Sequence, residues 1–283
     1  MVVKILAVSG GVDSVVMLDL IAKSGEDKRE ILVAHFNHGI RDDSDEDEVF
    51  VEGLAEKYGV KFEHKKEYLG EGASEELARE RRYLFLQEVA LRYGGVICTA
   101  HHADDVVETI AINLIRGTGW RGLVPLDNIE ILRPMLKRKK EDNIKYAHDN
   151  GLIWREDKTN SDDKYLRNRV RKSLRQIPED DKERLIELYA KQKELKHEID
   201  DLARDFLVDD GIYERRLFCE MDEAVASEVL RAVLIGVGKT TTMPQRRLLF
   251  NAIKTFKSGK KLNLLKDFMV VFSRDKFWFD VIK

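Results

Sequence analysis

Short apolar runs alternate with amphipathic segments over the first 115 residues of the chain. The runs are five or six residues long and predict buried or apolar strands at 3–8, 31–36 and 95–100 and an edge-like strand at 60–64. Between them, apolar residues at spacings of three and four predict helices at 14–22, 44–55, 74–93 and 101–115. We therefore expect an α/β fold, a doubly wound parallel sheet, with its ligand at the carboxyl ends of the strands.

One long amphipathic pattern marks the second half of the chain. Apolar residues at spacings of three and four predict a single connector helix from about Asp180 to Leu207. Beyond it, helical patterns and strand-like runs predict a small α+β domain, with helices at 224–236 and 244–258 and strands at 268–272 and 276–281. The expected organisation is a catalytic domain at 1–178, the connector helix at 179–207 and a small C-terminal domain at 208–283.

Composition narrows the class of protein. The chain has 283 residues, 43% of them hydrophobic, which is enough for about two domains with proper cores. No apolar run approaches the roughly 18 residues that span a bilayer, and the N-terminus leads straight into a strand, so we expect a soluble, cytoplasmic protein without a membrane partner. Cys98 and Cys219 stand alone, which argues against a disulfide framework and against a Cys-x-x-Cys metal or redox site.

Charge is distributed unevenly along the chain. The net charge is −3, yet residues 133–175 hold 14 Lys/Arg against 7 Asp/Glu, and residues 229–266 hold 9 Lys/Arg and no acid. Acidic residues concentrate elsewhere, above all at 42–48. Two basic surfaces on an acidic body are typical of a protein that grips a polyanion such as a nucleic acid at two places.

The stretch Ser9-Gly10-Gly11-Val12-Asp13-Ser14 joins the first strand to the first helix. The first N–H groups of a helix lack partners, glycine lets a phosphate approach the main chain, and the two serines add hydroxyl donors. A Walker loop also needs a lysine, but no Lys or Arg lies between Lys4 and Lys23. The stretch therefore predicts a phosphate site that does not transfer a γ-phosphoryl group.

A second constellation begins where the fourth strand ends. In a helix that starts there, His101, Asp105 and Glu108 share one face, with Asn113 further along. Two carboxylates that face a nucleotide site suit Mg²⁺ or the deprotonation of an amine nucleophile. A zinc site would need more nitrogen or sulfur ligands.

Arginines recur beside the glycine turns. Together they suggest bidentate grips on phosphate, although each alone would be an ordinary surface residue. The run Lys137-Arg138-Lys139-Lys140 fits a solvated helix start or, equally, a contact to an RNA backbone.

In combination these motifs resemble the tRNA(Ile)-lysidine synthetases, which are ATP pyrophosphatases with a PP-loop. The hexamer at 9–14 resembles the PP-loop, and further blocks follow in family order at 35–41, 78–83, 100–109, 116–123, 133–136, 156–160 and 167–171. The likeness is nearly continuous from residue 4 to residue 172. Beyond Leu207 it is one of arrangement, and longer members of the family carry a further C-terminal domain.

The resemblance implies a two-step reaction. ATP adenylates the C2 oxygen of the wobble cytidine in an isoleucine tRNA with a CAU anticodon, and the ε-amine of free L-lysine then displaces AMP. Asp13 and Asp105 would handle Mg²⁺, and Asp105 and Glu108 would bind or deprotonate the lysine amine. Arg116 and Arg171 would balance charge that develops during adenylate transfer.

The resemblance also assigns the remaining site residues. Those expected at ATP are Ser9, Gly10, Gly11, Val12, Asp13, Ser14, His35 and Arg116. Those expected to be catalytic are Asp13, Asp105, Glu108 and Arg171. Those expected at the tRNA or lysine are Arg79, Arg82, His101, His102, Asn113, Lys137, Arg138, Arg167 and Asn168. The small C-terminal domain would bind tRNA, and a homodimer remains one option.

Other functions fit parts of the same pattern. A PP-loop sulfurtransferase that acts on tRNA would usually rely on Cys-x-x-Cys pairs, which this chain lacks. A GMP or NAD synthetase would leave the basic surfaces and the arginine blocks unexplained. A non-catalytic nucleotide-binding or tRNA-binding module is the alternative of a different class, and the presence of the carboxylates and Arg171 weighs against it.

Overall fold

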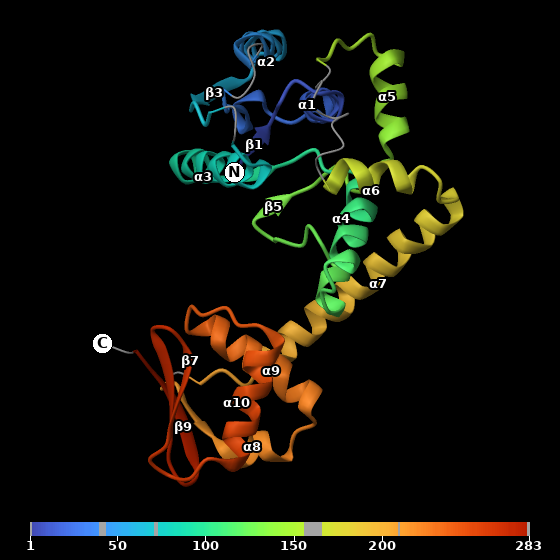
Figure 1. Cartoon of the computed structure of the whole chain (residues 1–283). Coiled ribbons are helices and arrows are strands. Elements are labelled where there is room, and N and C mark those ends of the chain that lie inside the picture. Colours follow the sequence, from blue (N-terminus) through green and yellow to red (C-terminus); the bar gives the residue numbers. More distant parts are fainter. Residues whose placement is uncertain (1, 40–43, 71–72, 156–165, 209, 282–283) are drawn as a thin grey trace. The chain divides into compact units, whose positions relative to one another are not determined.

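The computed structural model describes residues 2–39, 44–70, 73–155, 166–208 and 210–281. Two compact units divide the chain, residues 1–190 and residues 191–283 (Figure 1). The division falls inside the long helix α7, Glu179–Arg204, which corresponds to the predicted connector. The assignment of separate functions to 1–178, 179–207 and 208–283 stays a prediction.

A five-stranded parallel sheet organises the first unit. Its strand order is β3-β2-β1-β4-β5, with β1 at Val3–Ala7, β2 at Ile31–Asn37, β3 at Lys61–Lys66, β4 at Gly95–Cys98 and β5 at Ile131–Leu132. Leu6 of the central strand pairs with Val33 on one side and with Cys98 on the other. The predicted parallel sheet is confirmed. Its fifth strand was not predicted, because a two-residue strand leaves no apolar run to detect.

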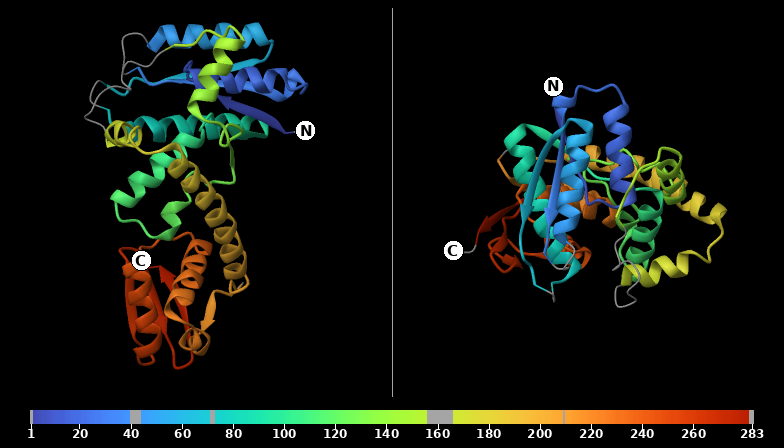
Figure 2. Two further views of the ribbon diagram at one scale, coloured as in Figure 1. Left: turned by 90° about the vertical axis from the view of Figure 1, so that its right-hand side faces the viewer. Right: turned by 90° about the horizontal axis from the view of Figure 1, so that it is seen from above.

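Helices cover both faces of this sheet. The unit contains α1 at Val12–Lys23, α2 at Ser44–Tyr58, α3 at Glu75–Tyr93, α4 at Ala103–Ile115, α5 at Lys140–Asp149 and α6 at Leu166–Leu174. Apolar residues of α1, α2 and α5 pack with Leu6 and Val33 on one face. Phe85 and Leu86 of α3 pack with Ile5 and Leu32 on the other, and Figure 2 shows these layers. The doubly wound arrangement is therefore confirmed.

One helix begins later than expected. The prediction placed His101 inside the helix that carries Asp105 and Glu108, but α4 begins at Ala103 and His102 is its N-cap residue. The prediction was wrong because the carboxylate of Asp105 accepts a hydrogen bond from the backbone N–H of His102, at 3.0 Å, which fixes the helix start there. His101 therefore precedes the helix and does not follow its spacing.

The second unit combines helices with an antiparallel sheet. After the end of α7 it contains β6 at Ile212–Glu214, α8 at Arg215–Glu220, α9 at Glu223–Gly236, α10 at Met243–Thr255, β7 at Lys261–Leu265, β8 at Phe268–Phe272 and β9 at Lys276–Val281. The strand order is β6-β9-β8-β7. Phe218, Leu230 and Phe277 are fully buried in its core. This is the predicted small α+β domain, although β6, β7 and α8 were missed. No described helix of the chain is long and apolar enough to cross a membrane.

Candidate active site

The glycine turn between β1 and α1 has the geometry that a phosphate loop needs. Gly10 has a φ of +89°, which other residues rarely adopt, and a Cβ there would lie 3.4 Å from the ring of Phe50. The hydroxyl of Ser14 donates to the carbonyl of Gly11 at 2.8 Å and accepts from the N–H of Ser9 at 3.2 Å. The turn is thus fixed by its own hydrogen bonds, with Val12 buried beneath it.

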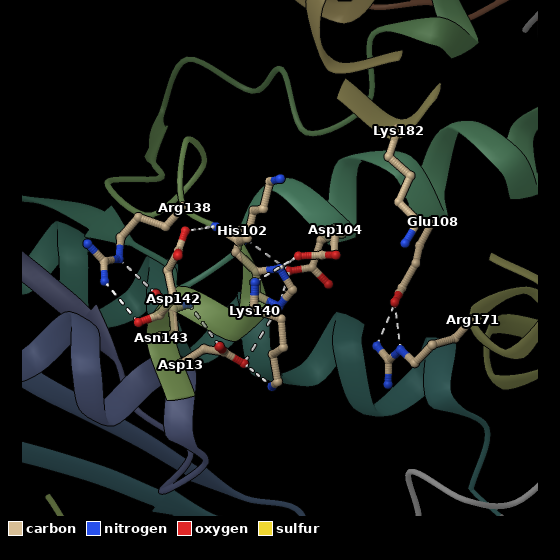
Figure 3. Close-up of polar contacts among 12 residues, drawn as sticks. Asp13, His102, Asp104, Glu108, Arg138, Lys140, Asp142, Asn143, Arg171 and Lys182 are labelled. Carbon is tan, nitrogen blue, oxygen red and sulfur yellow. Dashed lines mark hydrogen bonds and ion pairs between the residues drawn. The ribbon is translucent and has the colours of Figure 1, made fainter. Parts of the chain in front are cut away.

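Asp13 lies in the first turn of α1 and meets two side chains from α5 (Figure 3). The ammonium group of Lys140 donates to its Oδ2 at 2.5 Å, and the amide of Asn143 donates to its Oδ1 at 3.0 Å. Arg138 supports this contact, because its Nε donates to the side-chain oxygen of Asn143 at 2.8 Å. The loop itself lacks a lysine, and the fold brings one to it from 127 residues away.

His102 lies among three carboxylates and is only 5% exposed. Its ring nitrogens are 3.4 Å from Asp104, 3.6 Å from Asp105 and 3.7 Å from Asp13. Burial lowers the pKa of His102, but the nearby carboxylates outweigh burial and the net shift is upward. Hydrogen bonding to His102 in turn lowers the pKa of Asp104 to about 2, and Asp104 also accepts the backbone N–H of Lys140 at 2.8 Å.

Two of the carboxylates of α4, Asp105 and Glu108, face two arginines of α6. Glu108, 4% exposed, accepts from Nε of Arg171 at 2.6 Å and from Nε of Arg167 at 3.1 Å. Asp105 accepts from Nη2 of Arg167 at 2.8 Å. Burial alone would raise the pKa of Asp105, but the charges of His102 and Arg167 reverse that effect, and the net shift is downward. His102 therefore links the phosphate loop to a buried carboxylate–guanidinium cluster.

Two further histidines are held without charge. The Nδ1 of His35 donates to the carbonyl of Val8 at 2.9 Å, and burial lowers the pKa of its ring. His101 lies 2.8 Å from the hydroxyl of Thr99 through its Nδ1. Burial, together with the positive charges of nearby arginines, lowers the pKa of His101 to about 3. These shifts favour the neutral form of both rings, which can act as hydrogen-bonding groups at the carboxyl ends of β2 and β4.

Several predicted site residues lie away from this cluster. Arg116 is exposed at the far end of α4, eleven residues beyond Asp105 and so about 16 Å along the helix axis. The side-chain amide of Asn113 donates to the carbonyl of Gly122 at 2.8 Å and so serves the following turn. Lys137 is exposed. Of these three, only Arg116 was expected at ATP, whereas Asn113 and Lys137 were expected at the tRNA or lysine, and these roles stay predictions.

The two predicted arginines of α3, Arg79 and Arg82, both lie close to the ring of Tyr83. The guanidinium carbons of Arg79 and Arg82 lie 5.1 Å and 5.6 Å from the ring centre of Tyr83. Asn168, on α6 between the predicted Arg167 and Arg171, is buried. Two parts of the predicted motifs, Arg41 and the block at 156–160, fall outside the described residues.

Sequence reasoning did not place Lys140, Asn143 or Asp104 in the site, and it interpreted Lys140 only as part of a basic run at a helix start or an RNA contact. Lys140 and Asn143 are three residues apart on α5, so they lie on one face of that helix. Recognition of α5 as a helix would have paired them, but nothing local indicates that this face meets Asp13.

The carboxylates of the site could hold Mg²⁺ only if a bound substrate or water supplied further oxygen ligands. Among the described residues, no group of three or more His, Cys, Asp or Glu side chains could hold a metal ion. Mg²⁺ commonly takes one or two carboxylates and completes its shell with water and substrate phosphates. The oxygens of Asp13 and Asp105 fit that pattern.

A parallel sheet with a glycine turn at the start of a helix, and with carboxylates at the same edge, is typical of a nucleotide-binding α/β domain. The comparison with protein families agrees, since the PP-loop domain model matches residues 3–177. The chain therefore belongs to the PP-loop family, whose members use ATP.

Curated relatives give a finer comparison. The tRNA(Ile)-lysidine synthase of Geobacter sulfurreducens is 37% identical over 182 residues, which cover 60% of this chain and 39% of the relative. That of Thermosipho africanus is 34% identical over 240 residues, covering 80% of this chain and 56% of the relative. The resemblance to this family is confirmed. The chain spans 39% to 56% of the length of these two relatives.

A solved structure supports the fold. The U34-tRNA thiolase NcsA from Methanococcus maripaludis, solved with its 4Fe-4S cluster, superposes with a TM-score of 0.58. The match covers 68% of this chain and 72% of the thiolase at 19% identity. At 19% identity this comparison supports a shared fold alone and assigns no reaction to this chain.

Proposed function

We propose that this chain forms lysidine in an isoleucine tRNA with a CAU anticodon, at the expense of ATP. The observation that carries the proposal is the position of Asp105 and Glu108. Both carboxylates are buried, and they are linked to the phosphate loop through His102 and Asp13. This arrangement supports a nucleotide site that would adjoin an amine-binding site, as adenylation followed by amine attack requires.

In the first step the phosphate loop would bind the polyphosphate of ATP. The C2 oxygen of the cytidine attacks the α-phosphorus, and the bond to the β-phosphate oxygen breaks to release pyrophosphate. The N–H groups at the start of α1 favour the negative charge of the leaving group. When bound, Mg²⁺ would be held by Asp13 and Asp105 and would offset phosphate charge.

In the second step the ε-amine of lysine attacks C2, and the bond from C2 to the AMP oxygen breaks. Lysine arrives as an ammonium ion and must lose a proton before it can attack. The oxygens of Asp105 and Glu108 already accept hydrogen bonds from Arg167 and Arg171, so they are aimed at cationic donors. We assign them the binding or the deprotonation of the lysine amine.

The tRNA would contact the two basic stretches, 133–175 in the first unit and 229–266 in the second. Exposed Lys137 belongs to the first stretch, and exposed Lys254 and Lys257 belong to the second. Contacts to phosphates would supply most of the affinity without base specificity. The homodimer stays one option that the tRNA-binding surfaces neither require nor exclude.

Incorporation of radiolabelled lysine tests the proposal. Wild-type protein with ATP, Mg²⁺ and a CAU isoleucine tRNA transcript should yield acid-insoluble label, and a methionine tRNA with the same anticodon should yield none. Pyrophosphate release that depends on tRNA but brings no label would keep adenylation and refute lysine as the nucleophile. The absence of both would favour a non-catalytic binding module.

A further inference from the structure

The phosphate loop obtains its cation from a distant helix. No Lys or Arg lies between Lys4 and Lys23, although phosphate binding at the start of a helix is commonly assisted by one. The first residue of α5, Lys140, places its ammonium nitrogen 2.5 Å from Oδ2 of Asp13, in the first turn of α1. A positive charge thus stands beside a side chain in the first turn of α1, the helix whose first N–H groups would receive a phosphate.

Helix α5 is anchored so that this lysine must face the loop. The hydroxyl of Tyr146 donates to buried Asp19 of α1 at 2.8 Å, and Asn143 donates to Asp13 at 3.0 Å. The backbone N–H of Lys140 donates to the carboxylate of Asp104 at 2.8 Å. These bonds fix the backbone of Lys140 from two sides.

The side chain of Lys140, in contrast, keeps freedom to move. It is 43% exposed, and its four-carbon stem lets the ammonium group shift while the backbone stays in place. Asp13 offers this ammonium a single carboxylate, whereas a polyphosphate at the start of α1 would offer several charged oxygens. Because the polyphosphate carries the larger negative charge, the ammonium group of Lys140 should bind it in preference to Asp13.

We propose that Lys140 is the phosphate-binding cation of this site, held on Asp13 in the free protein and transferred to the β- and γ-phosphates when ATP binds. The proposal rests on the proposed function, because it concerns the same ATP site. It adds that the lysine of a Walker loop is replaced here by a residue of α5. Since the β- and γ-phosphates leave together, this lysine stabilises the departing pyrophosphate.

Titration calorimetry with the full chain tests this assignment. Lys140→Met should weaken the binding of ATP and of metal-free tripolyphosphate by about tenfold or more, because a charge-assisted hydrogen bond is removed. Its affinity for AMP, which lacks these phosphates, should stay within about twofold of wild type. Lys140→Arg should recover most of the affinity. Lys145→Met, an exposed lysine of the same helix, is the matched control and should bind all three ligands normally.

A second pair of variants separates contact with phosphate from an indirect effect through Asp13. In an Asp13→Asn background the ion pair is gone, so a lysine that binds phosphate should still matter for tripolyphosphate. An unchanged affinity of Lys140→Met for tripolyphosphate, or an effect that vanishes in the Asp13→Asn background, would overturn the proposal.

Failure of the proposed function would look different. Wild-type protein that binds ATP but incorporates no lysine would refute lysidine formation while the comparison of Lys140 variants stands. Wild-type protein that binds neither ATP nor tripolyphosphate would refute both.

Discussion

At the scale of single residues, the site is defined by charges that hold one another in place. Glu108 is buried and accepts hydrogen bonds from two guanidinium groups, of Arg167 and Arg171. Removing one partner of such a network leaves an uncompensated charge, which costs about 3–5 kcal/mol. A variant that tests the proposed role of Glu108 would therefore also change stability, and experiments must measure both.

Neutralising the carboxylates separately should stop lysine incorporation. We expect Asp105→Asn and Glu108→Gln each to lower the rate by at least about 100-fold, because each variant lacks a group that positions and deprotonates the amine. Thermal melts identify variants that fail to fold. Glu56→Gln, at an exposed carboxylate of α2, should keep the wild-type rate. Near-normal incorporation by both site variants would refute the assignment of these carboxylates.

His101 should make the protein sensitive to acid. Its pKa falls from 6.5 to about 3 on folding, because of burial and the charges of Arg79, Arg82 and Arg133, against the opposing effect of Asp105. Between those pH values the unfolded chain takes up a proton that the folded chain does not, so stability falls as pH drops from 6.5 towards 3.

His101→Gln should therefore flatten this acid dependence. Urea unfolding midpoints measured at neutral and acidic pH compare the variant with wild type, and His148→Gln, at an exposed position, is the control. Equal slopes for His101→Gln and wild type would show that this histidine does not titrate as described.

At the scale of elements, the docking of α5 on α1 decides the site. Asp19 is 1% exposed and accepts hydrogen bonds from Tyr58 at 2.5 Å and from Tyr146 at 2.8 Å, while Lys23 lies 2.9 Å away. This contact joins α1, α2 and α5, and apolar packing of the three helices surrounds it. Because α5 also carries Lys140 and Asn143, a shift of this helix moves the two side chains that donate hydrogen bonds to Asp13.

Tyr146→Phe should loosen this helix without opening a cavity. We expect the free energy of unfolding to fall by about 1 kcal/mol, since one hydrogen bond to a buried carboxylate is removed and two partners remain. Urea unfolding measures the change. Tyr68→Phe, at an exposed tyrosine, should change stability by less than about 0.5 kcal/mol. Equal stabilities of the two variants would mean that Asp19 does not anchor α5.

At the scale of the whole molecule, the proposed function would use basic surfaces in both units. The second unit has its own aromatic core and a four-stranded sheet, and its basic stretch runs from α9 through α10 and β7. The main hydrophobic core clusters of each unit consist of residues from that unit. The proposed tRNA substrate would be the ligand that both units share.

The salt dependence of tRNA binding tests the role of the second unit. Lys254→Gln combined with Lys257→Gln removes two exposed charges and should weaken tRNA binding. The slope of log affinity against log salt should also become shallower, by about 0.9 for each duplex phosphate that the variant no longer neutralises. Lys191→Gln, at an exposed lysine of α7, should leave the slope unchanged. An unaltered slope in the double variant would exclude these lysines from the interface.

The sequence by itself determined the features that depend on neighbouring residues. The first four strands, most of the long helices and the glycine turn follow from apolar spacing and from glycine's backbone freedom, which a short window of sequence records. Two carboxylates of α4 were also identified, because Asp105 and Glu108 lie at helical spacing near a strand end, whereas Asp104 was not placed in the site. Short elements such as β5, and the start of α4 after His101, were missed because their limits depend on hydrogen bonds rather than on periodicity.

Only the tertiary structure decided which distant groups meet. Lys140 comes to Asp13 across 127 residues, and Arg171 reaches Glu108 across 63. A run of basic residues looks the same in sequence whether it faces solvent, RNA or a carboxylate. The packing of α5 on α1 and of α6 on α4 determines the partners of Lys140 and Arg171. A buried charge is costly unless an opposite charge lies close to it, and only the packed fold shows which opposite charge is close enough.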